Sequence, residues 1–212
     1  MIDLVWLIPL FPAVGFLICG LGRNIFPKAV IGTIASLAVV ASFAVSLGIF
    51  FEFNSLEPVI VTLFDWITVG KIHIPFAFQI DQLSILMLLI ITGIGSLIHI
   101  YSTGYMSHDA GFGKFFAYLN LFVFFMLLLV LGSNYVIMFI GWEGVGLCSY
   151  LLIGFWYTNG AYADAAKKAF IMNRIGDLGF LIGVFLIIST FGSVSFAEIF
   201  PRAEGMISGD AT

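Results

Sequence analysis

Residues 134–157, NYVIMFIGWEGVGLCSYLLIGFWY, indicate a membrane protein because they are apolar along nearly their whole length. At a helical rise of about 1.5 Å per residue, such a run can cross the roughly 30 Å hydrocarbon core of a bilayer. Its acidic residue, Glu143, would lie about 14 Å deep, near the middle of that core. A carboxylate is costly in lipid, so Glu143 must face protein or water, and a functional role is the default interpretation.

The composition of the whole chain is that of a membrane protein. Of its 212 residues, 61% are hydrophobic and 9% are charged, and the mean hydropathy is +1.15. Soluble domains contain about a quarter charged residues. The length suits about six spans of roughly 20 residues and leaves no room for an ordinary soluble domain. We predict an all-α polytopic membrane protein, and no nucleic-acid partner, since no nucleotide fingerprint is present.

Six apolar runs predict six transmembrane helices within a single transmembrane domain, residues 1–212. Their approximate ranges are 2–21, 30–51, 82–105, 114–131, 134–157 and 165–190. The first run is expected to be a retained helix rather than a cleaved signal, because Arg23 follows it and no basic residue precedes it. The link Gly132-Ser133 is so short that the fourth and fifth helices must be antiparallel neighbours. Cys19 and Cys148 fall within spans and predict no disulfide.

The segment 59–80 predicts a β-hairpin instead of a helix. Polar and apolar residues alternate in VIVTLFDWITVGKIHIPFAFQI, β-branched and aromatic residues abound, and a Gly70-Lys71 turn separates the two halves. A lone hairpin has unpaired edges, which lipid does not tolerate. We therefore expect this hairpin on the membrane surface.

The basic residues predict the orientation of the helices. The first, third and fifth intervals between spans contain Arg23, Lys28, Lys114, Lys167 and Lys168, whereas the other intervals and the tail contain Lys71 and Arg202. Cytoplasmic loops carry an excess of Lys and Arg. The N-terminus and the hairpin are thus expected on the outer face.

The charged residues inside the spans form the candidate site. Glu143 is interpreted as a protonatable relay, and the alternative is a neutral acid hydrogen-bonded to a neighbouring helix. Arg174 and Asp177 lie about as deep in the sixth span, spaced i, i+3, so they can pair within one helix. They form either a structural ion pair or a titrating Asp177 whose charge balance Arg174 sets.

Two further residues are considered for proton transfer. Lys167 falls within about 80° of Arg174 and Asp177 on a helical wheel, so it could take up protons at the membrane edge. An interfacial anchor is the favoured interpretation. His99 has the right titrating side chain, but a hydrogen bond to a neighbouring helix is the favoured role. No His or Cys spacing suggests haem, iron–sulfur or zinc, so we expect no cofactor in this chain.

Three strings resemble a known family. They are FAFQIDQLSILMLLIITGIGSLIHIYSTGYM (76–106), GWEGVGLCSYLLIGFWY (141–157) and AKKAFIMNRIGDLGF (166–180). They resemble the antiporter-like subunits of NADH–quinone oxidoreductase (respiratory complex I), called subunit L or mitochondrial chain 5. A more distant similarity is to the large subunit of Mrp-type sodium/proton antiporters.

The resemblance implies the N-terminal part of a long antiporter-like helical bundle, with inverted repeats of five helices that each contain a broken helix. Glu143 would be the helix-five glutamate that pairs with a lysine on the broken helix seven, and Arg174 and Asp177 would match charged positions on helix six. The chain ends before that seventh helix. It would therefore be the N-terminal fragment of a longer subunit.

The resemblance also implies a function. The subunit would translocate protons in a bacterial or mitochondrial inner membrane, as part of an NADH:quinone oxidoreductase enzyme. NAD, FMN, iron–sulfur clusters and quinone would bind to partner subunits, and the direct partners would be other membrane-arm subunits, especially a neighbouring antiporter-like one. The alternatives are an Mrp-type sodium/proton antiporter subunit, a structural scaffold subunit and a membrane hydrogenase subunit, and the sequence leaves the ion open.

Overall fold

Six long helices dominate the computed structural model, which describes residues 1–55, 57–70 and 72–208. They are α1 (Leu7–Gly22), α2 (Lys28–Glu52), α3 (Gln82–Tyr105), α4 (Phe112–Leu131), α5 (Tyr135–Ile153) and α6 (Gly160–Phe191). A short 3-10 helix, Ile2–Leu4, precedes α1. All six are long and apolar enough to cross a membrane, which confirms the predicted polytopic fold.

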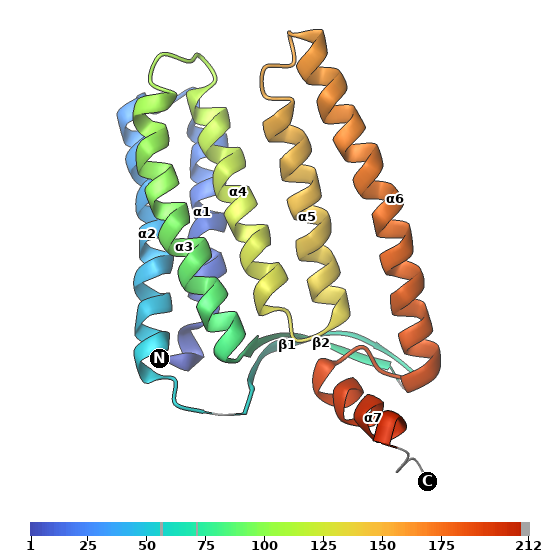
Figure 1. Ribbon diagram of the computed structural model, residues 1–212. Coiled ribbons are helices and arrows are strands. Elements are labelled where there is room, and N and C mark those ends of the chain that lie inside the picture. Colours follow the sequence, from blue (N-terminus) through green and yellow to red (C-terminus); the bar gives the residue numbers. More distant parts are fainter. Residues whose placement is uncertain (56, 71, 209–212) are drawn as a thin grey trace.

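The helices divide into a compact bundle and an open pair. Helices α1 to α4 pack around one another, α5 lies against α4, and α6 packs mainly against α5 (Figure 1). The core of the bundle consists of aliphatic and aromatic side chains, including Ile8, Val39, Leu88, Leu127 and Leu131. As the short Gly132-Ser133 link predicted, α4 and α5 are antiparallel neighbours (Figure 1).

Side-chain caps define where α3 and α5 begin. Asp81 and Ser84 form a capping box, in which the Ser84 amide donates to Asp81 Oδ1 and the Asp81 amide donates to Ser84 Oγ, both at 2.7 Å. Asn134 Oδ1 accepts from the amides of Val136 and Ile137. These bonds satisfy amides that would otherwise lack partners in the first helical turn.

The hairpin is confirmed as two antiparallel strands, β1 (Val59–Val69) and β2 (Ile72–Ile80). It crosses one end of the helices (Figure 1). Gly70 has φ 61°, a left-handed conformation that glycine adopts without strain. Lys71, the other residue of the predicted turn, lies outside the described residues.

Hydrogen bonds attach the hairpin to the start of α5. The Ser133 amide donates to Ala77 O at 3.2 Å, and Asn134 Nδ2 donates to Pro75 O at 3.0 Å. The α4–α5 link thus pairs with part of the free edge of β2, which limits the exposure of unpaired backbone groups. Through Asn134, the hairpin also holds the helix that carries Glu143.

Two regions differ from the ranges expected from hydropathy. Helix α6 begins at Gly160, five residues earlier than expected, because Asn159 Oδ1 caps it by accepting from the Ala161 amide. A further helix, α7 (Phe196–Ser208), follows α6 at the end of the molecule where the hairpin lies (Figure 1). Charged residues, Glu198, Arg202 and Glu204, interrupt its apolar ones, and a search for long apolar runs does not detect such an amphipathic pattern. Residues 209–212 lie outside the described part of the chain.

Candidate functional site

Glu143 and Arg174 form an ion pair that joins α5 to α6. Arg174 Nη1 donates to Glu143 Oε2, and the same nitrogen lies 3.5 Å from Asp177 Oδ2. The structure therefore brings together all three charged residues that the sequence placed deep in the spans. One guanidinium lies between two carboxylates, of which one is on α5 and the other is a single turn away on its own helix.

Asp177 is the most buried member of this cluster. Its side chain is 7% exposed, against 23% for Glu143 and 40% for Arg174. Trp142 Nε1 donates to Asp177 Oδ1 at 2.8 Å, which satisfies the carboxylate oxygen that does not face Arg174. Sequence reasoning missed Trp142, although its position next to Glu143 and its indole N–H were available as signals.

Aromatic rings hold the cluster from both helices. The Arg174 guanidinium lies over the Phe170 ring at 4.6 Å, within the range of a cation–π contact. The Trp142 and Phe180 rings stack at 6.2 Å. Arg174 Nε is buried and has no hydrogen-bond partner among the described residues. The arginine therefore has an unused donor beside its two carboxylate contacts.

A cavity lies on each side of the ion cluster. One, of about 380 Å³, is lined by the charged Glu143 and Arg174, by Gly144 and by apolar side chains that include Phe139 and Phe170. The other, of about 270 Å³, is lined by Trp142, Ser149, Asn173, Asp177 and three further residues. The second contains hydroxyl, amide and carboxylate groups, so its walls can hydrogen-bond water.

The charges of the cluster do not cancel. Glu143, Arg174 and Asp177 in their ionised forms sum to one negative charge, which a proton can neutralise. Because Arg174 Nη1 is bonded to one carboxylate and within ion-pair distance of the other, a small movement exchanges its partner. The arrangement can therefore couple the position of a cation to the binding of a proton.

The other two candidates lie outside the cluster. Lys167 Nζ is 3.5 Å from Asp164 Oδ1, and both side chains are largely exposed. His99 is fully buried in the α1–α4 bundle, where its Nδ1 hydrogen-bonds Gly95 O at 2.8 Å and its Nε2 lies 3.4 Å from Asn120 Nδ2. Neither residue bonds to the cluster within the described part of the chain.

Two family models match the chain and together cover more than half of it. Residues 66–116 match the model for the N-terminus of chain 5 of NADH-ubiquinone oxidoreductase (complex I). Residues 132–210, which include the ion cluster, match the transmembrane model for NADH:quinone oxidoreductase and Mrp antiporter proteins. The chain belongs to the NADH:quinone oxidoreductase/Mrp antiporter family.

Two similar proteins are named as subunits of NADH-quinone oxidoreductase. The chain is 48% identical to "NADH-quinone oxidoreductase subunit L" of Mycobacterium tuberculosis, covering 92% of this chain and 31% of the relative. It is 45% identical to the protein of the same name from Campylobacter jejuni, covering 94% of this chain and 33% of the relative. The chain thus spans about a third of the length of these relatives.

A solved structure has the same helical fold. A chain of the membrane-bound sulfane sulfur reductase, an archaeal respiratory membrane complex, superposes with a TM-score of 0.81 at 17% identity, covering 93% of this chain and 39% of that chain. At this identity the match establishes the fold alone.

Among the described residues, no group of three or more His, Cys, Asp or Glu side chains could hold a metal ion.

Proposed function

We propose that this chain forms part of a proton-translocating membrane-arm subunit of an NADH–quinone oxidoreductase. The observation that carries the proposal is Arg174, which lies between Glu143 on α5 and Asp177 on α6 within an antiporter-family transmembrane region. Three charged side chains at this depth carry a high energetic cost in a membrane. Charged residues that persist there usually belong to an ion or proton pathway or pair with one another.

Glu143 acts as the switching carboxylate. While Arg174 pairs with Glu143, the negative charge is compensated and the acid stays ionised. When Arg174 shifts toward Asp177, Glu143 loses its cation and binds a proton to neutralise its charge. The return of Arg174 releases that proton. The cavity beside Asp177 supplies polar groups for water that would carry the proton to and from the cluster.

The energy for this cycle comes from redox chemistry in partner subunits. NAD, FMN, iron–sulfur clusters and quinone bind there, and electrostatic change reaches this chain through adjacent membrane-arm subunits, including another antiporter-like one. In the inner membrane the end with the basic residues faces the cytoplasm or matrix, because positive residues are retained on that side. The N-terminus and the hairpin then face outward.

The substitution Glu143→Gln in the complete subunit, assembled in its complex, tests the proposal. We expect the number of protons translocated per electron in reconstituted vesicles to fall while the complex still assembles. The matched control is Asp164→Asn, which removes an exposed carboxylate from α6 and leaves the cluster intact. An unchanged proton-to-electron ratio in Glu143→Gln would remove Glu143 from the pathway.

The same preparation separates the alternatives. An Mrp-type antiporter would exchange sodium for protons without NADH oxidation. A scaffold subunit would tolerate the exchange Arg174→Asp with Asp177→Arg, which keeps the charges but reverses their order. Loss of proton translocation in the exchanged variant, with normal assembly, supports transport over scaffolding.

A further inference from the structure

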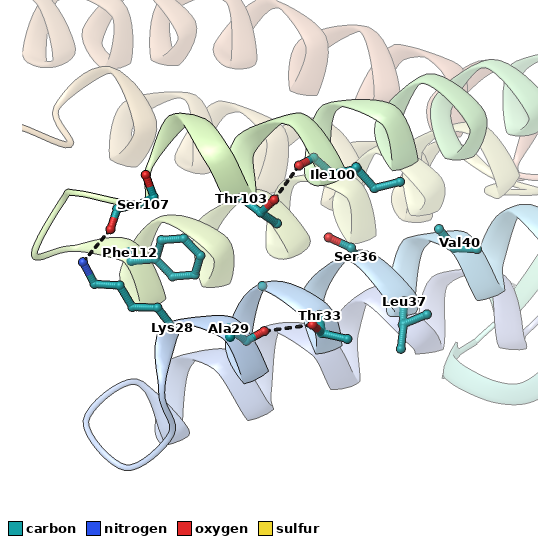
Figure 2. A pocket seen from close by; sticks show the side chains of 11 residues that line it. Lys28, Ala29, Thr33, Ser36, Leu37, Val40, Ile100, Thr103, Ser107 and Phe112 are labelled. Atoms are coloured by element: carbon teal, nitrogen blue, oxygen red, sulfur yellow. Dashed lines mark hydrogen bonds between the residues drawn. The ribbon is translucent and has the colours of Figure 1, made fainter.

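A groove on the outer surface of the bundle runs between α2 and α3 at the end opposite the hairpin (Figure 1). It has a volume of about 590 Å³ and is open on one side. Figure 2 shows that α2 forms one wall, α3 the other, and that Phe112 at the start of α4 lies near the outer end. This groove is separate from the ion cluster on α5 and α6.

The inner part of the groove is apolar. Leu37, Val40 and Ile100 line it, and both Leu37 and Ile100 are more than half exposed. The hydroxyls of Thr33 and Thr103 donate to carbonyls of their own helices, at 2.8 and 2.7 Å, so they add little polarity (Figure 2). A polar ligand would gain few hydrogen bonds here, whereas an alkyl chain would bury apolar surface on both sides.

Ser36 is the exception along this wall. Its side chain is nearly buried, and its Oγ has no hydrogen-bond partner among the described residues. It lies eight residues, or about 12 Å, along α2 from Lys28. A single unpaired hydroxyl at the inner end can accept one water and does not make the groove polar.

The outer end of the groove is positively charged. Lys28 Nζ donates to Ser107 O at 2.9 Å, which leaves two of its three N–H groups for another acceptor (Figure 2). Among the described residues no carboxylate lies within 4.0 Å of Lys28 Nζ. Asp109 keeps its negative charge and interacts with Lys28 electrostatically, but its two oxygens accept from Trp156 Nε1 and the Gly111 amide rather than from Lys28 Nζ.

The start of α2 reinforces this charge. Lys28 is the first residue of α2, and no side chain caps that end of the helix. Unpaired amides and the helix dipole make a helix N-terminus favourable for anions. Ala29, in the same turn, also lines the groove. The cation, the uncapped helix end and the mouth of the groove therefore coincide.

We propose that this groove binds one anionic phospholipid, with its phosphate on Lys28 and an acyl chain between α2 and α3. From Lys28 to Val40 the helix rises about 18 Å, roughly the depth of one leaflet of the hydrocarbon core. The phosphate would lie at the membrane edge, where Lys28 is positively charged. The alkyl chain would extend inward along the apolar part of the groove. The bound lipid seals the seam between the two helices on their membrane-facing side.

Photocrosslinking of the complete subunit in its complex tests this site. The complex is reconstituted in phosphatidylcholine vesicles with a trace of phosphatidylglycerol or phosphatidylcholine that carries a diazirine on its acyl chain, and adducts are mapped by peptide mass spectrometry. We expect phosphatidylglycerol adducts at Leu37, Val40 and Ile100 to exceed phosphatidylcholine adducts by about fivefold, since one lysine near the surface attracts an anionic lipid by this order.

Two variants and two matched controls make the test specific. Lys28→Gln removes the positive charge and should abolish the preference for phosphatidylglycerol. Thr33→Phe fills the groove from an exposed position and should abolish the adducts of both lipids at Leu37, Val40 and Ile100. Lys168→Gln removes another exposed lysine, and Leu86→Phe adds bulk elsewhere on α3. Both controls should behave like the unchanged protein.

Three outcomes overturn the proposal. Equal labelling by both lipids indicates a general lipid annulus, and a preference that survives Lys28→Gln places the anion elsewhere. No adduct from either lipid, with normal labelling at Leu86, means that protein covers the groove.

Discussion

The α1–α4 bundle and the α5–α6 pair use their polar residues in opposite ways. In each helix of the bundle, 33% to 39% of the residues in an apolar 18-residue stretch are buried. The corresponding share is 22% in α5 and 11% in α6. Four hydroxyls of the bundle, those of Ser42, Ser46, Thr92 and Ser96, bond to the carbonyl four residues back on their own helix, and Ser42 Oγ also lies within hydrogen-bond distance of Ile8 O on α1. In the pair, ionised side chains bond across helices instead.

Because of this difference, we interpret the α1–α4 bundle as a rigid scaffold and the α5–α6 pair as the part whose ion pairs can rearrange. A hydroxyl that bonds to its own helix is satisfied whatever its neighbours do, so these hydroxyls do not require a partner on another helix. The interhelical polar contacts of the bundle that involve Ser42 with Ile8 O, and His99 with Asn120, are between neutral groups. The carboxylates of the pair depend on one arginine that both can reach. A shift of α6 relative to α5 changes the electrostatics of the pair and leaves the bundle unaltered.

The largest effect is expected from Arg174→Ala. It leaves Glu143 and Asp177 without their cation, which should abolish proton translocation and lower the free energy of unfolding by about 3–5 kcal/mol. The measurements are proton-to-electron stoichiometry and thermal unfolding of the assembled complex. Arg174→Lys is the control, because it keeps the charge but loses the planar fork, and should retain part of both. If Arg174→Ala were as stable to thermal unfolding as the unchanged protein, the positive charge of Arg174 would not stabilise the contact between α5 and α6.

A smaller effect is expected where the bundle meets the pair. In Gly141→Ala, the new Cβ would lie 2.6 Å from Leu129 Cα, a backbone atom that cannot yield, so α4 and α5 must separate. We expect a loss of about 1–3 kcal/mol and reduced assembly, measured by thermal unfolding and by the yield of intact complex.

Gly179→Ala is the matched control, because nothing lies within 4 Å of a Cβ at that position. It should be neutral or stabilise α6 by up to about 1 kcal/mol through helix propensity. If Gly141→Ala were as well tolerated as the control, the close contact of α4 with α5 would not support the site.

His99→Gln asks directly whether the bundle takes part in transport. We expect a loss of about 1–2 kcal/mol, because the contact with Asn120 is disturbed in a fully buried position, and an unchanged proton-to-electron ratio. The ratio and the thermal midpoint should be measured on the same preparation. A reduced ratio would assign His99 the transport role that the sequence left open, and the contrast between bundle and pair would fail.

The smallest effect is expected at the cap of α3. Partial burial acts to raise the pKa of Asp81, but hydrogen bonds donated by Ser84 and Gln79 outweigh it and hold the pKa below its usual range. Stability from this cap is therefore present above the unfolded pKa of about 4 and is lost as the pH falls through the lower folded value.

Asp81→Ala should accordingly destabilise the start of α3 by about 1 kcal/mol at pH 7, and the difference from the unchanged protein should vanish in strong acid. Amide hydrogen exchange at the first turn of α3 reports both. Asp65→Ala, an exposed carboxylate on β1, is the control and should not alter exchange in α3. A difference that persists in acid would contradict the capping role of the ionised Asp81.

Much of the fold was accessible from local patterns. Each span is a run of apolar residues whose length alone matches a bilayer, and the hairpin follows from alternation around Gly70. The early start of α6 and the whole of α7 were missed for the same reason. Their residues are too polar to register as apolar runs, and their helical state depends on the Asn159 cap and on an amphipathic surface.

The candidate site was only partly predictable. The depth of Glu143 and the i, i+3 pairing of Arg174 with Asp177 both follow from helical geometry along one chain segment. The pairing of Glu143 with Arg174, and of Trp142 with Asp177, joins two helices. Within the described part of the chain Glu143 pairs with Arg174. The lysine on a later helix that the family resemblance implies as a partner of Glu143 is not part of this sequence and stays a prediction.

Hydrophobicity and distance along a helix are enough to predict, from the residues alone, that this chain crosses a membrane, where its spans lie and which charges lie deep within them. Which charges meet, that His99 is enclosed, and that a groove lies beneath Lys28 became apparent from the packing of the helices. Those facts depend on the rotation of each helix about its axis and on its neighbours, and many weak packing contacts spread over the whole chain set both.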